Sequence, residues 1–265
     1  MRHVISSIQE SISSLLGKGD PLLPPRRLIE AAGGGDFDQI GQEFFRHFRR
    51  IGGLKPHHRV LDVGCGCGRM AVPMIPFLAD AGEYRGFDIA PGAIHWAKKH
   101  IAARYPRFHF DLADIRNLAY NPKGKGEAHE YRFPYESNFF DFAFLTSVFT
   151  HMMARDMRHY LDEISRTLKP GGRCLINYFL LNPVSLEKTR KGESRLSFPH
   201  PLPECFATDE DKPDAAIAYD ENFVRSSLAK AGLSIVEPIH YGCWSGRKPF
   251  LSFEDIVLAV KTGAR

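Results

Sequence analysis

The sequence lacks the features that mark a membrane or secreted protein. No stretch of the 265 residues is apolar enough to span a bilayer, and residues 1–20 lack the continuous apolar core of a signal peptide. The five cysteines are odd in number, and two of them lie in one glycine-rich loop, which does not indicate a disulfide framework. We therefore expect a protein of the reducing cytoplasm.

The charge of the chain is close to balanced. Its formal net charge is +4, and no run of Lys or Arg occurs, so the sequence carries no clear signal for nucleic-acid binding. A content of 43% hydrophobic and 25% charged residues is typical of a globular protein. The length suits one or two domains.

The first 35 residues differ in pattern from the rest. Ile5, Ile8, Ile12 and Leu15 recur at helical spacing, opposite a serine-rich face. We expect residues 1–35 to form an amphipathic helix and a linker, and residues 36–265 to form the main domain. The helix would pack on that domain or on a second subunit of a homodimer, and contact with a membrane surface is the weaker alternative.

From residue 36 onward, short apolar runs alternate with helical patterns. The predicted strands are residues 60–63, 83–89, 107–115, 139–149, 173–181, 233–244 and 253–261, and the predicted helices are residues 38–50, 91–105, 154–168 and 220–232. This alternation predicts an α/β fold with a doubly wound, mostly parallel, seven-stranded Rossmann-like sheet. The last two strands have no helix between them, which predicts an antiparallel C-terminal strand pair.

Two insertions interrupt this rhythm, near residues 118–138 and 182–218. Both are rich in turn-forming residues, and the second is longer than an ordinary loop, which indicates a lid or a binding segment. Their aromatic residues could form the wall of a small-molecule pocket. These residues are Tyr131, Phe133, Tyr135, Phe198 and Phe206.

The most informative stretch is VLDVGCGCGRM, which begins at Val60. The acid Asp62 is followed by glycines at every second position, so the backbone must turn sharply and allow a ligand to approach closely. A dinucleotide fingerprint needs glycine at the first, third and sixth positions, but the sixth position from Gly64 is Arg69. Cys65 and Cys67 lack the partners of a zinc site, so we expect no metal.

With these residues in view, the chain resembles the class I S-adenosylmethionine-dependent methyltransferases. The matching pieces follow in family order: LDVGCGCGR, Asp88 in YRGFDI, Asp114 in DLADI, the strand DFAFLTSVFTHM, and the turn LKPGG before RCLINY. The resemblance extends from Val60 to about Lys261. It implies S-adenosylmethionine as cofactor and methyl transfer to a small molecule, as in the bacterial members.

The chemistry of the cofactor fits the matched residues. Glycines allow the backbone to approach the amino-acid end and the ribose, Asp88 can accept from both ribose hydroxyls, and Asp114 can accept from the adenine amine. Asp62 would orient the loop or the cofactor ammonium. The predicted cofactor-binding residues are Asp62, Gly64, Cys65, Gly66, Gly68, Asp88, Ile89, Asp114, Ile115, Ser147 and Val148.

The acceptor side is predicted from the strand ends. A hydroxyl acceptor requires a base, and His151, just past the fourth strand, is the predicted catalytic residue for O-methylation. The predicted acceptor contacts are Tyr178, His200, His240 and Tyr241.

Two other functions stay open at this point. One is a non-catalytic S-adenosylmethionine-binding module, and the other is an N-methyltransferase for an amine or a nucleic acid. The Asn-Pro-Pro-aromatic motif of amino-directed nucleic-acid methyltransferases is absent after the fourth strand, where TSVFTHM stands. The paired-glutamate loop of protein arginine methyltransferases is absent as well.

Overall fold

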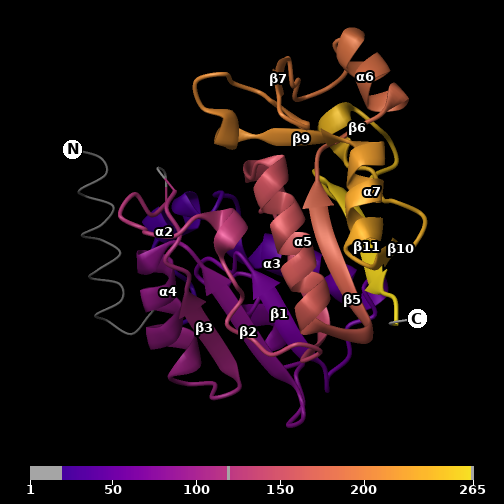
Figure 1. The fold of residues 1–265 in the computed structure, drawn as a ribbon. Helices are drawn as coiled ribbons and strands as arrows, with labels where there is room; N and C mark the ends of the chain where they lie inside the picture. The colour runs from indigo at the N-terminus through magenta and orange to yellow at the C-terminus, as the bar shows by residue number, and fades with distance from the viewer. Residues whose placement is uncertain (1–19, 118–119, 264–265) are drawn as a thin grey trace, which may run out of the picture.

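A computed structural model describes residues 20–117 and 120–263 of the chain. Its main feature is a seven-stranded sheet in the order β10-β11-β5-β4-β1-β2-β3, which confirms the predicted fold class (Figure 1). The strands are β1 (Arg59–Val63), β2 (Glu83–Asp88), β3 (Phe108–Leu112), β4 (Phe140–Leu145), β5 (Leu168–Tyr178), β10 (Leu233–Ile235) and β11 (Asp255–Lys261). The first five are parallel to one another, and β11 runs antiparallel to its neighbours β5 and β10.

Helices cover both faces of this sheet, which explains why its strands are apolar on both sides. The main helices are α3 (Phe37–Arg50), α4 (Pro91–Ala97), α5 (Ala154–Thr167) and α7 (Glu221–Lys230). Neighbouring strand residues point to opposite faces, so Val60 packs in the cluster that contains α3 and α4, whereas Leu61 packs in the cluster that contains α5 and α7. The ligand side of such a sheet is the edge where the parallel strands end.

Several elements are shorter than the sequence predicts. The helix expected at residues 91–105 is α4 followed by a π-helical turn, Lys98–Ala102. The strand expected at residues 233–244 ends at Ile235, and the chain then runs through the short helix η6 (Cys243–Ser245) before β11 begins. Residues 236–254 therefore form a long connection between two paired strands.

The second insertion is folded rather than a loop. It contains α6 (Pro183–Arg190), β7 (His200–Leu202), β8 (Cys205–Ala207) and η5 (Pro213–Ala215). With β6 (Leu180–Leu181) and β9 (Ile217–Asp220) it forms a four-stranded sheet in the order β6-β9-β8-β7. Figure 1 shows this sheet above the end of β5, on the ligand side of the main sheet.

The first insertion packs into the core over its described residues, 120–138, which include the short helix η3 (Ala128–Glu130). Phe133 and Tyr135 are buried against Phe87, and Phe198 of the second insertion is buried as well. These three rings are part of the core, and none of them lines the cavity beside the glycine-rich loop.

The N-terminal amphipathic helix expected within residues 1–19 lies outside the described residues. Within the expected linker, the structure has the short helix α2 (Arg26–Ala31). None of the helices in residues 20–117 and 120–263 has both the length and the hydropathy that a bilayer-spanning helix needs.

Candidate active site

The glycine-rich loop follows β1 and turns in the left-handed region of backbone space. Gly64, Gly66 and Gly68 have φ of +80°, +52° and +85°. A Cβ at Gly64 would lie 2.4 Å from Val148 Cγ2, so the two chains approach more closely there than a side chain allows. At Gly66 the nearest atom would be Ala32 Cβ at 3.4 Å, and the space beside this glycine is free for a ligand.

Asp88, at the end of β2, holds this loop. Its Oδ2 accepts a hydrogen bond from the Gly66 N–H at 2.8 Å, and its Oδ1 accepts one from the Ala90 N–H at 2.8 Å. Loss of hydration raises the pKa of Asp88, and these main-chain donors partly offset that rise. Each oxygen keeps a lone pair, so these contacts leave Asp88 able to accept further hydrogen bonds, and ribose binding by Asp88 stays a prediction.

Asp62 lies buried beneath the loop. Its Oδ2 accepts a 2.5 Å hydrogen bond from the Tyr84 hydroxyl, whereas its Oδ1 is buried and has no partner among the described residues. Burial raises the pKa of Asp62 to about 8. An unpaired buried oxygen is a point where a ligand donor would gain a hydrogen bond.

A cavity of about 290 Å³ opens beside this loop. Its lining comes from the N-terminal helices, the glycine loop, the end of β4 and the residues before β11. The lining residues are Ala32, Gly33, Ile40, Glu43, Phe44, Gly64, Cys65, Gly66, Cys67, Arg69, Met70, Thr146, Ser147, Ser252, Phe253 and Glu254. The predicted residues Gly64, Cys65, Gly66 and Ser147 therefore meet at one cavity.

The segment after β4 approaches the cavity in a strained conformation. Ser147 has φ of +56°, a value that is uncommon for a residue other than glycine. Its hydroxyl donates to Glu254 Oε2 at 2.9 Å, and the Thr150 hydroxyl donates to Glu254 Oε1 at 3.4 Å. Burial raises the pKa of Glu254 to about 7.

Sequence reasoning did not identify Glu254, Glu43 or Arg69 as site residues. Glu254 is separated from Ser147 by 107 residues, and the only local signal is an acidic pair before the last strand. Glu43 is a half-buried residue of α3, and a single charged residue in an amphipathic helix is ordinary. Arg69 takes the position that excluded the dinucleotide motif, and its Nη2 donates to the Gly34 carbonyl at 2.6 Å.

The residues predicted for the adenine end lie along the next strand ends. Asp114 is exposed just after β3, and Ile115 beside it is buried. The Gly126 N–H donates to the Asp114 carbonyl oxygen at 2.8 Å, so the first insertion packs directly on this pair. Ile89, Asp88, Asp114 and Ile115 are not among the residues that line the cavity at the loop.

His151 lies on η4 (Phe149–His151), one turn beyond Ser147. Its Nδ1 is 2.8 Å from the Asp214 carbonyl oxygen, in the second insertion. It is not among the residues that line the cavity. The structure thus places the predicted base beside the insertion.

The four predicted acceptor contacts do not gather at the cavity. Tyr178 is fully buried in the core, with its ring against Phe149 and Tyr219. His200 is on β7, and its Nδ1 is 3.9 Å from Glu210. The backbone of His240 pairs with Ile256 of β11.

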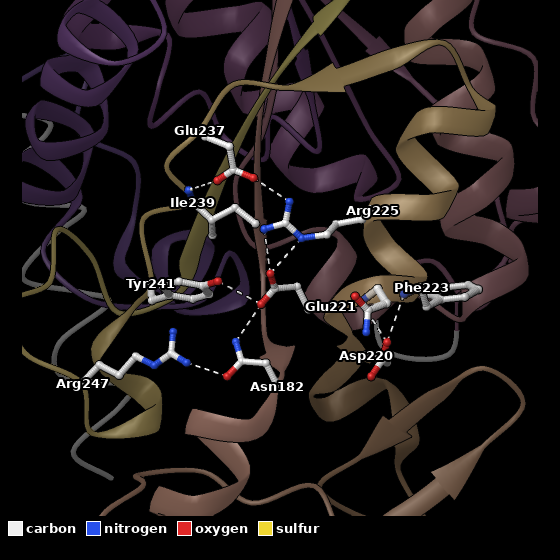
Figure 2. A network of polar contacts seen from close by, with 10 residues as sticks. Asn182, Asp220, Glu221, Phe223, Arg225, Glu237, Ile239, Tyr241 and Arg247 are labelled. Carbon is white, nitrogen blue, oxygen red and sulfur yellow. Dashed lines mark hydrogen bonds and ion pairs between the residues drawn. The ribbon is translucent and has the colours of Figure 1, made fainter.

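Tyr241 belongs to a polar network that joins three parts of the chain (Figure 2). Its hydroxyl donates to Glu221 Oε2 at 3.0 Å, and the Arg247 guanidinium lies 3.8 Å from its ring centroid. Glu221, at the start of α7, also accepts from Asn182 Nδ2 at 2.7 Å and from Arg225 Nε at 2.9 Å. The network attaches the second insertion and the β10–β11 connection to α7.

A larger and more open hollow, of about 450 Å³, lies elsewhere. It is lined by residues 132–137 and Arg166, which precede β4 or end α5. Arg166 is already paired with Glu163 at 2.6 Å, and no glycine-loop residue reaches this hollow. We therefore take the smaller cavity as the candidate active site.

Comparison with known proteins identifies the family. A family model described as "Methyltransferase domain" matches residues 54–221, well over half of the chain. The chain therefore belongs to this methyltransferase family.

Two curated relatives carry quinone names. A 2-phytyl-1,4-naphtoquinone methyltransferase of Trichormus variabilis is 28% identical over 124 residues, or 47% of this chain and 48% of the relative. A demethylmenaquinone methyltransferase of Bacillus cereus is 28% identical over 126 residues, or 48% and 46%. The chain thus matches about half the length of these relatives.

Solved structures share the fold. A TehB-like S-adenosylmethionine-dependent methyltransferase of Corynebacterium glutamicum aligns with a TM-score of 0.51 and 15% identity, over 89% of this chain and 94% of that one. Magnesium protoporphyrin IX methyltransferase of Synechocystis, with bound S-adenosylhomocysteine, aligns with a TM-score of 0.53 and 14% identity, over 88% and 92%.

The residues present fit S-adenosylmethionine. The left-handed glycines and the free space beside Gly66 form a cradle for a hydroxyl-bearing ligand without phosphate, and the unpaired Asp62 Oδ1 lies buried beneath it. S-adenosylmethionine is the cofactor of this family, and it supplies an electrophilic methyl group. In this chain Asp88 and the main chain of Gly64–Gly68 would hold it.

Proposed function

We propose that the chain transfers a methyl group from S-adenosylmethionine to a hydroxyl of a small molecule. The observation that carries this proposal is the cavity in which the glycine loop meets the end of β4 and Glu254. A donor and an acceptor bound here would be aligned for displacement, and alignment of this kind contributes up to about 7–11 kcal/mol. No acid is needed, because the leaving sulfur departs neutral.

A small-molecule acceptor is supported by the charge of the cavity. Its charged lining residues are Glu43, Glu254 and Arg69, of which only one is a cation. A nucleic-acid site would instead present several cations for phosphates. The names of the relatives, which refer to quinones and a porphyrin, agree with a small-molecule acceptor.

The cofactor part of the proposal is tested by calorimetry with S-adenosylhomocysteine. The intact chain should bind it, and absence of binding would refute the proposal. The acceptor part is tested with labelled cofactor and a panel of phenols, sugars, amines and nucleic acids. Transfer to hydroxyl compounds is expected, whereas transfer to amines alone would indicate N-methylation, and binding without any transfer would indicate a non-catalytic module.

His151 can act in one of two ways in this reaction. The sequence predicts a base, in which case His151→Ala lowers kcat and leaves the acceptor KM unchanged. Its contact with the Asp214 carbonyl oxygen supports a positioning role, because the side chain joins the end of β4 to the second insertion. In that case His151→Ala raises the acceptor KM more than it lowers kcat, and we propose this second outcome.

A further inference from the structure

Glu254 is a buried carboxyl group at the candidate active site. It directly precedes β11, is only 9% exposed, and lines the same cavity as Gly64 and Gly66. Its neighbour Phe253 is 41% exposed and lines that cavity as well, which places the β10–β11 connection at the cavity mouth. Glu254 and the glycine loop therefore face the same space.

Each oxygen of Glu254 accepts from a hydroxyl of the segment after β4. Ser147 donates at 2.9 Å and Thr150 at 3.4 Å, and Glu254 forms no ion pair within residues 20–117 and 120–263. Ser147, whose backbone lies in the left-handed region with φ of +56°, makes the shorter of these two contacts. Two hydroxyls orient the carboxylate while leaving lone pairs free for a further donor.

The surroundings give this carboxyl group a pKa suited to proton transfer. Burial raises the pKa of Glu254 to about 7, and the negative charge of Asp255 adds to the rise, whereas the Ser147 and Thr150 hydroxyls lower it. A general base works best when its pKa lies near the working pH. The other charged or titratable groups of the cavity lining are Glu43, Arg69, Cys65 and Cys67, and the neighbouring elements α3 and η4 carry His47 and His151.

We propose that Glu254 is the catalytic base that accepts the proton of the acceptor hydroxyl. This assignment rests on the proposed function. The acceptor oxygen forms a bond to the methyl carbon, and the carbon–sulfur bond breaks with its electron pair staying on sulfur. The hydroxyl proton moves to a free lone pair of Glu254, whose carboxylate becomes a carboxylic acid and later releases the proton to water.

The proposal is tested with two phenols of different acidity at pH 8. 4-Methylphenol arrives protonated and needs a base, whereas 4-nitrophenol is already ionised and needs none. We expect Glu254→Gln to lower transfer to 4-methylphenol by about 10²–10⁴-fold and transfer to 4-nitrophenol by only a few-fold. For 4-methylphenol, the rise in wild-type rate between pH 6 and 8 should vanish in this variant. Glu204→Gln, at an exposed ion pair with Arg158, is the matched control.

Calorimetry with S-adenosylhomocysteine separates the possible failures. An equal loss of rate with both phenols, in a Glu254→Gln variant that still binds S-adenosylhomocysteine, would make Glu254 structural and overturn the proposal. An unchanged rate in this variant would also overturn it. So would a rise of the rate with pH that vanishes in His151→Ala but persists in Glu254→Gln. Wild-type protein that binds the product but methylates neither phenol would also overturn it, whereas failure to bind the product would instead refute the proposed function.

Discussion

Asp88 and Gly66, which lie 22 residues apart in sequence, are joined by a hydrogen bond of 2.8 Å between the carboxylate Oδ2 and the main-chain N–H. The contact couples the end of β2 to the turn after β1. It fixes the loop in the shape that leaves space beside Gly66. The residue predicted to bind the ribose therefore also shapes the surface on which the cofactor would lie.

Asp88→Ala should weaken binding of S-adenosylhomocysteine. The variant removes an acceptor for the ribose and frees the Gly66 N–H, and loss of such a pair costs about 1–3 kcal/mol. Calorimetry measures the affinity, and Asp80→Ala, at an exposed aspartate paired with Arg107, is the control. An affinity within twofold of the wild type would contradict the role of Asp88.

Gly64→Ala should destabilise the protein and abolish cofactor binding. Gly64 and Gly171 have nearly the same φ, +80° and +79°, but a Cβ would clash with Val148 only at Gly64. Gly171→Ala therefore isolates the backbone strain of about 1–2 kcal/mol. Denaturant unfolding of both variants gives the comparison, and equal losses would show that the close approach at Gly64 carries no cost.

The stability of the cofactor-free protein should depend on Asp62 in a pH-dependent way. Its pKa is about 8 in the folded chain, against about 4 when unfolded, so the folded state binds the extra proton. The free energy of unfolding then falls as pH rises from about 4 to 8. Asp62→Asn removes this dependence, so its melting temperature relative to the wild type should be higher at pH 8.5 than at pH 4.5. A difference that does not change with pH would contradict the raised pKa.

Glu221→Gln should destabilise the attachment of the second insertion. Glu221 accepts from Asn182, Arg225 and Tyr241 (Figure 2), and removing its charge weakens these hydrogen bonds by about 1–3 kcal/mol in total. Glu237→Gln, at the exposed end of the same network, should cost at most about 1 kcal/mol. Equal losses in denaturant unfolding would argue against a central role for Glu221.

The sheet and the glycine loop were predictable because their signals are local. Apolar runs alternate with helical patterns over most of the chain, and this alternation predicts the strand and helix order. The signal for the loop, Asp62 followed by glycines at every second position, is contained in a few consecutive residues. The four-stranded sheet was not predictable, because β7 and β8 have only three residues each, too few to show an alternation of apolar and polar residues.

Glu254 was missed because its role depends on tertiary contacts. It meets Ser147 only after the connection of residues 236–254 folds over the end of β4. Tyr178 and Tyr241 were expected at the acceptor because the sequence shows where strands end but not which tertiary contacts form there. Their place at strand ends is visible in the sequence, but the neighbours that bury Tyr178 and pair with Tyr241 are not.

The second insertion is flanked by two strands that lie side by side. Leu180 and Leu181 of β6 pair in parallel with Tyr219 and Asp220 of β9, at a strand spacing of about 4.8 Å. Residues 183–216 form a cassette between these strands, and because the strands are parallel, any replacement must run from the end of β6 back to the start of β9. A replacement needs apolar side chains where Cys205 and Ala207 are buried. Because this cassette lies on the ligand side of the sheet, such chimaeras offer a route to new acceptor preferences on an unchanged cofactor site.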